Sequence, residues 1–210
     1  MPAADHTPLG VSRRDAHVAA SPGGPVGPST RVYRIGLSAA AAGGALWIVS
    51  EAVEIAGGGI SSPSMALLIA GCLLLAAGVP ALHRAQAHRA GALSLAGAAM
   101  LSVATALEAL TDTIGWGADN VEDIQAETGP LIPVFGVLLV LGGIALGTAI
   151  LRAGVLPRWT GILLIAAPPL LPVVNAAGLP EELTSVAKSL IGLAILGGAM
   201  AALSAQRHRP

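Results

Sequence analysis

Three ionisable residues stand inside apolar stretches of this sequence: Glu51, Glu108 and Lys188. A charged side chain in hydrocarbon is costly, so such residues face the interior of a helix bundle, where they pair or line a water-filled cavity. Lys188 can neutralise one of the two glutamates. The carboxylate left over could carry a proton or bind a cation, so the sequence predicts an intramembrane polar site.

Helical spacing extends this site along two of the helices. Glu54 follows Glu51 by three residues and Asp112 follows Glu108 by four, so each pair shares one helix face. Counted from the ends of their apolar stretches, Glu51, Glu108 and Lys188 all lie ~24–25 Å from the inner face. Asn175, near the end of another apolar stretch, is expected at the same level. Two simpler interpretations stay open. Glu54 and Asp112 could be hydrated helix ends, and the ion pair could serve only to fix the order of the helices.

The elements that carry these residues follow from composition. Hydrophobic residues make up 54% of the 210 residues and charged residues only 11%, against about 25% charged in soluble domains. Lipid must therefore cover much of the surface. A membrane-spanning helix needs about 20 apolar residues. We predict an all-α bundle of six transmembrane helices within residues 31–206, at about 35–56, 64–82, 91–111, 131–151, 159–177 and 184–204.

Arginine positions predict the orientation of this bundle. All ten arginines lie before the first stretch, after the last, or in alternate loops between, whereas the remaining loops are neutral or acidic. Lys/Arg-rich short loops stay in the cytoplasm. We therefore expect a multi-pass protein of the inner (plasma) membrane with both termini cytoplasmic. Residues 1–30, rich in proline and glycine, are predicted to be a disordered cytoplasmic tail.

Small residues and prolines mark two further features. Gly143 and Gly147 form a GxxxG pattern that predicts a helix-packing face. Pro168, Pro169 and Pro172 lie inside the stretch 159–177. Proline removes a backbone donor and clashes with the preceding turn, so we expect this helix to be kinked or broken.

Several functions are disfavoured by what the sequence lacks. It contains neither HExxH nor GxxxxGK[ST], and its five histidines all lie outside the apolar stretches. The single cysteine, Cys72, cannot form an intramolecular disulfide or a CxxC site. We therefore predict no catalytic residues, no metal site, no cofactor and no enzymatic activity. A net charge of −1 argues against binding to nucleic acid.

The segment LRAGVLPRWTG, residues 151–161, joins a glycine-rich stretch to the next apolar stretch. It resembles a recurring element of small actinobacterial multi-pass membrane proteins that have no assigned activity. The resemblance covers under a third of the chain and implies a six-helix inner-membrane bundle without implying a reaction. The strong preference for arginine over lysine also suggests an actinobacterial, GC-rich genome.

Two functional hypotheses follow. The first is a small transporter-like protein, or one that responds to ions or protons, whose partners are the lipid bilayer and a cation or proton. The second is a non-catalytic membrane scaffold or accessory subunit that binds a partner membrane protein or another copy of itself. A site that responds to ligands would favour the first hypothesis, and stable co-purification with another protein would favour the second.

Overall fold

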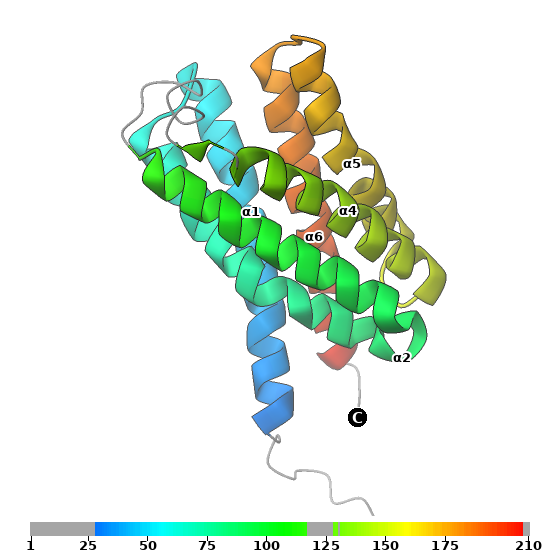
Figure 1. The fold of residues 1–210 in the computed structure, drawn as a ribbon. Helices are drawn as coiled ribbons and strands as arrows, with labels where there is room; N and C mark the ends of the chain where they lie inside the picture. The colour runs from blue at the N-terminus through cyan, green and yellow to red at the C-terminus, as the bar shows by residue number, and fades with distance from the viewer. Residues whose placement is uncertain (1–27, 117–127, 130, 208–210) are drawn as a thin grey trace, which may run out of the picture.

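A computed structural model describes residues 28–116, 128–129 and 131–207. This part of the chain is helical and contains no strand. Each of its five helices is long and apolar enough to cross a membrane. They are α1 (Pro28–Gly57), α2 (Ser62–Ile114), α4 (Leu131–Ala153), α5 (Arg158–Ala176) and α6 (Glu181–Arg207) (Figure 1). The expected all-helical fold is confirmed, and the five apolar helices are compatible with a helical membrane bundle. Residues 1–27 of the expected tail lie outside the described residues, and α1 begins earlier than expected, at Pro28.

The helix count differs from the expected six because α2 is one element of 53 residues. A straight helix of that length would reach about 80 Å, far more than the ~30 Å hydrocarbon core. α2 is not straight. Gly91, with φ 51° and ψ −139°, interrupts the helical backbone, and the chain turns back so that two arms lie side by side (Figure 1). The expected stretches 64–82 and 91–111 are these two arms.

Polar contacts stabilise α2 at two places, its start and its bend at Gly91. At the Gly91 bend, Gln86 Nε2 donates a hydrogen bond of 2.9 Å to Ser94 Oγ, and both side chains are buried. At the start of α2, Ser61 and Ser64 form a reciprocal capping box. Such a cap satisfies backbone N–H groups that have no partner within the helix. The sequence thus fixes both the beginning of α2 and the place where it reverses.

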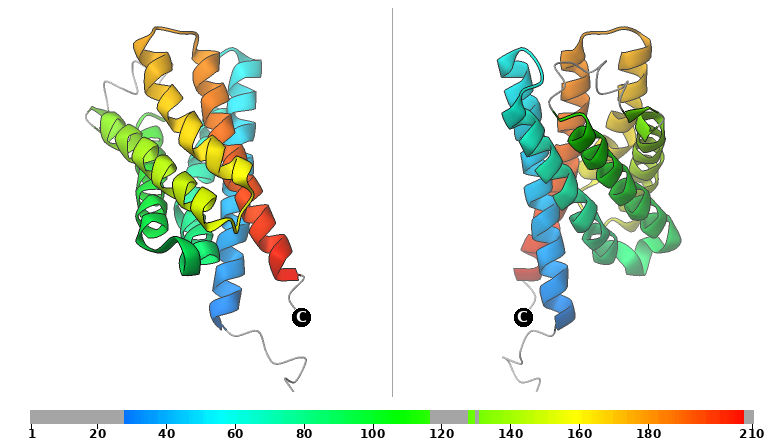
Figure 2. Two further views of the ribbon diagram at one scale, coloured as in Figure 1. Left: turned by 90° about the vertical axis from the view of Figure 1, so that its right-hand side faces the viewer. Right: turned by 60° about the vertical axis from the view of Figure 1, so that its left-hand side comes forward.

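The five elements form a closed ring in chain order: α1 packs on α2, α2 on α4, α4 on α5, α5 on α6, and α6 on α1. α2 and α6 also touch across the interior, over a much smaller interface. Figure 2 shows α6 running beside both α1 and α5. Large apolar side chains fill the ring, including Trp47, Leu101, Leu146 and Ile195, which are fully buried.

The two ends of the bundle differ in charge. The start of α1 and the end of α6 lie at the same end as the Gly91 bend and the 154–157 turn (Figure 1). This end carries all the arginines of the described residues: Arg31, Arg34, Arg84, Arg89, Arg152, Arg158 and Arg207. The opposite end holds the 58–61 and 177–180 turns and the acidic first turn of α6. The bundle therefore has one basic and one acidic end.

Of the kink or break expected in α5, the break is wrong. A single helix runs from Arg158 to Ala176 through Pro168, Pro169 and Pro172. Packing accounts for this continuity. α4 approaches α5 so closely that a Cβ atom on Gly143 would lie 2.6 Å from the Leu164 carbonyl oxygen, and one on Gly147 would lie 2.6 Å from that of Gly161. Contact with α4 on this face supports the helical path that the prolines weaken.

We predict that Gly91→Ala destabilises the protein, because a Cβ is strained at φ 51°. The cost should be about 1–3 kcal/mol and should lower the midpoint of thermal unfolding in nanodiscs. Gly136→Ala is the matched control, since a Cβ at Gly136 meets no atom within 4 Å and helical Ala is favoured over Gly. Equal midpoints for the two variants would contradict this role for Gly91.

Candidate polar site in the bundle

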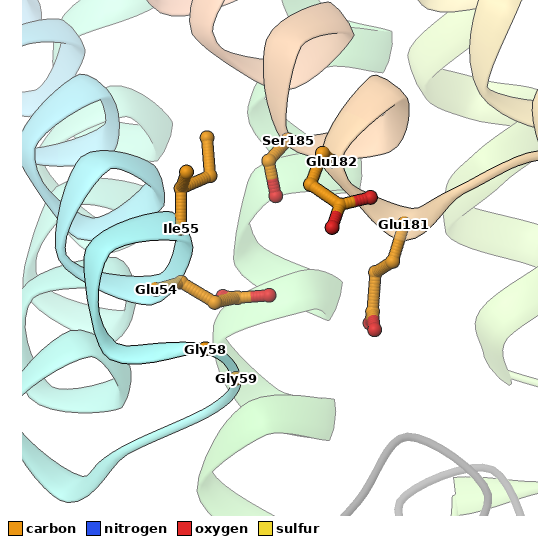
Figure 3. Close-up of a pocket in the computed structure, with 7 residues that line it drawn as sticks. All are labelled: Glu54, Ile55, Gly58, Gly59, Glu181, Glu182 and Ser185. Carbon is orange, nitrogen blue, oxygen red and sulfur yellow. The ribbon is translucent and has the colours of Figure 1, made fainter.

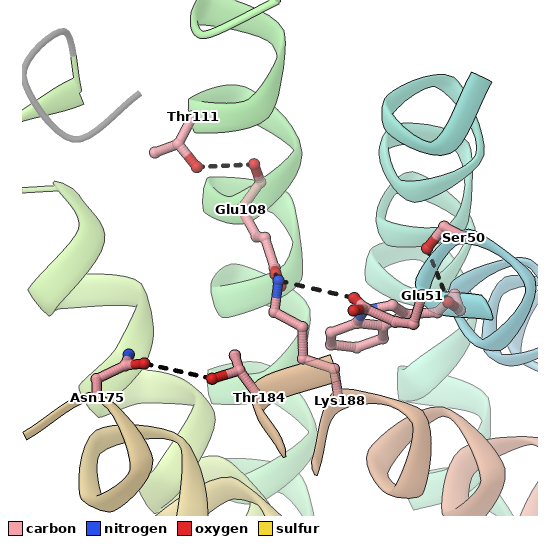
Figure 4. A network of polar contacts seen from close by, with 8 residues as sticks. Ser50, Glu51, Glu108, Thr111, Asn175, Thr184 and Lys188 are labelled. Atoms are coloured by element: carbon pink, nitrogen blue, oxygen red, sulfur yellow. Dashed lines mark hydrogen bonds and ion pairs between the residues drawn. The ribbon is translucent and has the colours of Figure 1, made fainter. Parts of the chain in front are cut away.

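Lys188 of α6 lies between two carboxylates that come from different elements. Its Nζ is 3.7 Å from Glu51 Oε1 on α1 and 3.4 Å from Glu108 Oε1 on α2. Both glutamate side chains are only 2% exposed, whereas that of Lys188 is 25% exposed. Figure 4 shows the lysine reaching across the bundle towards both acids. The structure therefore brings together the three ionisable residues that the sequence singles out.

Helix geometry explains why these residues meet. Glu51 lies six residues before the end of α1 at Gly57, and Glu108 lies six before the end of α2 at Ile114. Lys188 lies seven residues after Glu181, where α6 begins. At 1.5 Å per residue, all three are ~9–11 Å from the acidic end of the bundle. The common depth places opposite charges within reach of one another.

A close approach of α1 to α6 sets the spacing of Glu51 and Lys188. A Cβ atom on Gly44 would lie 2.6 Å from the carbonyl oxygen of Gly192, so neither helix can carry a larger residue there without moving apart. Gly44 lies two turns before Glu51, and Gly192 lies one turn after Lys188. Each glycine therefore shares a helix face with its charged residue. Small residues bring the two backbones together where the ion pair forms.

The carboxylates are only partly satisfied. Trp47, one turn before Glu51 and fully buried, donates an Nε1 hydrogen bond of 3.3 Å to Glu51 Oε1. Thr111 donates to the backbone carbonyl of Glu108 rather than to its carboxylate. Within the described residues, Glu108 Oε2 and Asp112 Oδ2 are buried without a hydrogen-bond partner. Two carboxylate oxygens thus remain available to a ligand.

Charge in and just outside this site is unbalanced. Glu51, Glu108 and Asp112 bring three carboxylates against the single ammonium of Lys188, which leaves two negative charges if all four groups are ionised. Glu54 adds a fourth carboxylate one turn beyond Glu51. Because uncompensated charge is costly in a low-dielectric interior, this excess favours uptake of protons or of a cation.

A pocket of about 100 Å³ opens beside this site at the acidic end. The pocket is lined by Glu54, Ile55, Gly58, Gly59, Glu181, Glu182 and Ser185 (Figure 3). Glu54 and Ser185 each lie one turn outward from a member of the ion pair, Glu51 and Lys188. Three carboxylates surround the opening. The pocket thus lies about one helical turn outward from Glu51 and Lys188, and its field attracts cations.

Asn175 is at the edge of this arrangement rather than within it. Its side chain is exposed, and its Oδ1 accepts a hydrogen bond of 3.3 Å from Thr184, one turn outward from Lys188 on α6 (Figure 4). This contact joins the facing ends of α5 and α6. The residue expected at the level of the ion pair instead links two helix ends.

Cys72 is a member of the site that the sequence did not reveal. It is fully buried on the first arm of α2. Its sulfur and one carboxylate oxygen each of Glu108 and Asp112 all lie within 4.8 Å of one another. Cys72 precedes Glu108 by 36 residues, and the reversal at Gly91 brings the two arms together. No sequence spacing signals such a contact.

We predict that Lys188→Met destabilises the protein by about 3–5 kcal/mol, because it leaves two buried carboxylates without their cation. Adding Glu51→Gln and Glu108→Gln should restore most of this loss. Chemical unfolding in nanodiscs measures both effects. Val186→Met, at an exposed position on the same helix, is the control and should behave as wild type. If Lys188→Met unfolds like this control, Lys188 does not stabilise the bundle.

Comparison with known proteins adds no relative to this geometry: no family model, curated protein or solved structure matches the chain.

Proposed function

We propose that this protein is a small, non-catalytic, transporter-like membrane protein that binds a cation or protons at the Glu51–Lys188–Glu108 site. One observation carries the proposal: a single ammonium group is shared by two buried glutamates, with Asp112 beside Glu108. A pair that served only to join helices would need one carboxylate. Intramembrane carboxylates in excess of their counter-ions are typical of ion and proton pathways.

The proposed topology has six membrane crossings, with both termini in the cytoplasm of a cell whose inner (plasma) membrane holds the protein. Two features support it. α2 is too long for one crossing and turns back at Gly91. The arginines of the described residues gather at the end where α1 starts and α6 finishes, which the positive-inside rule assigns to the cytoplasm. The acidic pocket then faces outward.

In this proposal the ligand enters through the acidic pocket and competes with Lys188 for the glutamates. Glu54, Glu181 and Glu182 raise the local concentration of cations. A cation or proton that binds to Glu51 or Glu108 weakens the ion pair between that carboxylate and Lys188. Since α6 touches α2 over a small interface, loss of the Lys188–Glu108 contact lets α6 shift relative to α2. Binding is thus coupled to a change in helix packing.

Cysteine labelling tests the topology in a Cys72→Ser background. Six crossings put Ser62→Cys and Leu179→Cys on one side and Val155→Cys on the other; all three positions are exposed. A membrane-impermeant maleimide added to whole cells should label the first two and spare the third until the cells are lysed. If α2 crossed once, positions 62 and 179 would lie on opposite sides, and only one of them would react.

Thermal unfolding in nanodiscs, over pH and a panel of monovalent and divalent cations, tests the site. A ligand that binds only the folded state stabilises it by about 2.7 kcal/mol at about 100 times its dissociation constant. We expect a shift with pH or with one cation in wild type, lost in Glu51→Gln and in Glu108→Gln. Asp15→Asn, the same chemical change N-terminal to α1, should keep it.

A flat response in wild type would overturn this function. Glu51, Glu108 and Lys188 would then form a structural ion pair, and the alternative of a scaffold or accessory subunit would take precedence. Co-purification with a partner protein that survives Glu51→Gln and Glu108→Gln would support that alternative.

A further inference from the structure

We propose that Cys72, Glu108 and Asp112 form a binding site for a thiophilic divalent metal ion of the Zn²⁺ type. One possible ligand atom from each, the Cys72 sulfur and one oxygen of each carboxylate, lies within 4.8 Å of the other two. The inference deepens the proposed function and rests on it through Glu108, which belongs to both sites.

Side-chain direction explains how three residues at different depths converge. Cα–Cβ bonds in a helix lean towards its N-terminus. Cys72 therefore leans towards the Ser62 end of its arm, while Glu108 and Asp112 lean away from the Ile114 end of theirs. Because these ends lie together at the acidic end of the bundle, the side chains meet between them. Glu108 and Asp112, four residues apart, lie on the same face of their arm, on the side towards Cys72.

Unsatisfied oxygens point to a ligand at this place. Glu108 is 2% exposed, and its Oε2 has no hydrogen-bond partner among the described residues; the buried Oδ2 of Asp112 is in the same state. Buried carboxylate oxygens normally accept hydrogen bonds or coordinate metals. Lys188 contacts Glu108 through Oε1, so Oε2 can bind an ion while the ion pair persists.

The donor set selects the class of metal. Zn²⁺ binds thiolate sulfur at about 2.3 Å and carboxylate oxygen at about 2.0–2.2 Å, with a tetrahedral arrangement. Those bonds require donor separations of about 3.3–3.8 Å, so small side-chain rotations would close the cluster around an ion. Mg²⁺ and Ca²⁺ prefer oxygen donors throughout, whereas a thiolate favours softer metals. A water molecule or a substrate could complete the coordination.

Charge balance favours the same ion. Glu51, Glu108 and Asp112 against Lys188 leave two negative charges, and the Cys72 thiolate formed on binding adds a third, so a divalent cation lowers the excess to one. As the metal–sulfur bond forms, the Cys72 thiol releases its proton to solvent, so binding is accompanied by proton release. The acidic pocket beside Glu54 and Ser185 attracts cations to this end of the bundle.

Co²⁺ is the probe, because its thiolate complexes show a sulfur-to-metal charge-transfer absorption that carboxylate complexes lack. The full chain, purified in nanodiscs with any affinity tag removed, is titrated with Co²⁺. We expect saturable binding of one ion per chain with this absorption, and its loss when Zn²⁺ is added. Cys72→Ser should abolish the absorption. Asp112→Asn should raise the Co²⁺ dissociation constant by more than about 10-fold, the smallest loss typical of a residue that merely supports a metal ligand.

Glu51→Gln is the matched control, because it removes a neighbouring carboxylate outside the proposed metal ligands. It should keep the charge-transfer absorption and the stabilisation by Co²⁺, while losing the response to pH or to non-thiophilic cations expected of the proposed function, so failure of either inference is seen separately. Thermal unfolding of each variant shows that it is folded. Absence of the absorption in wild type, or its persistence in Cys72→Ser, would overturn the metal site.

Discussion

An ammonium group inside a bundle of apolar helices is stable only beside carboxylates, and those carboxylates must come from helices that reach the same depth. Lys188 meets this condition by contacting Glu51 on α1 and Glu108 on α2. The contact between Gly44 and Gly192 brings α1 close enough to α6, and the reversal at Gly91 returns the second arm of α2 to the correct end. Much of the ring geometry can be understood as satisfying this one buried charge.

Much of this arrangement could be predicted because helices convert sequence distance into depth. Low charge and long apolar stretches predicted a helical membrane protein. Counting residues from the stretch ends put Glu51, Glu108 and Lys188 at one level, and the structure places Lys188 Nζ within 3.7 Å of a carboxylate oxygen of each glutamate. The same counting placed Asn175 with them, but its depth alone could not show that it would bond to Thr184 at the edge of the bundle.

What could not be predicted depends on contacts between segments. By helical rise, Cys72 is ~15 Å and Asp112 ~3 Å from the acidic end, so depth alone separates them. Side chains on the two antiparallel arms lean in opposite directions along the bundle, which removes much of that difference. Packing of the arms then brings the Cys72 sulfur within 4.8 Å of one oxygen of each carboxylate. The prolines of α5 raise a similar difficulty. The missing backbone donor of proline and its clash with the preceding turn indicated a kink or a break, but contact with α4 at Gly143 and Gly147 supports a continuous helix.

The small interface between α2 and α6 has a mechanical consequence. Neighbours around the ring are joined by extensive apolar packing. Where water replaces such a contact, separating the helices costs about 25 cal/mol of free energy for each Å² of apolar surface exposed. Across the interior, the Lys188–Glu108 contact joins α2 and α6 with little packing beside it. Of the helix pairs in contact, α2 and α6 therefore have the least packing to lose when they separate. The Lys188–Glu108 contact between them is electrostatic, so a change of charge on either residue, rather than a mechanical force on the helices, is the direct way to weaken it.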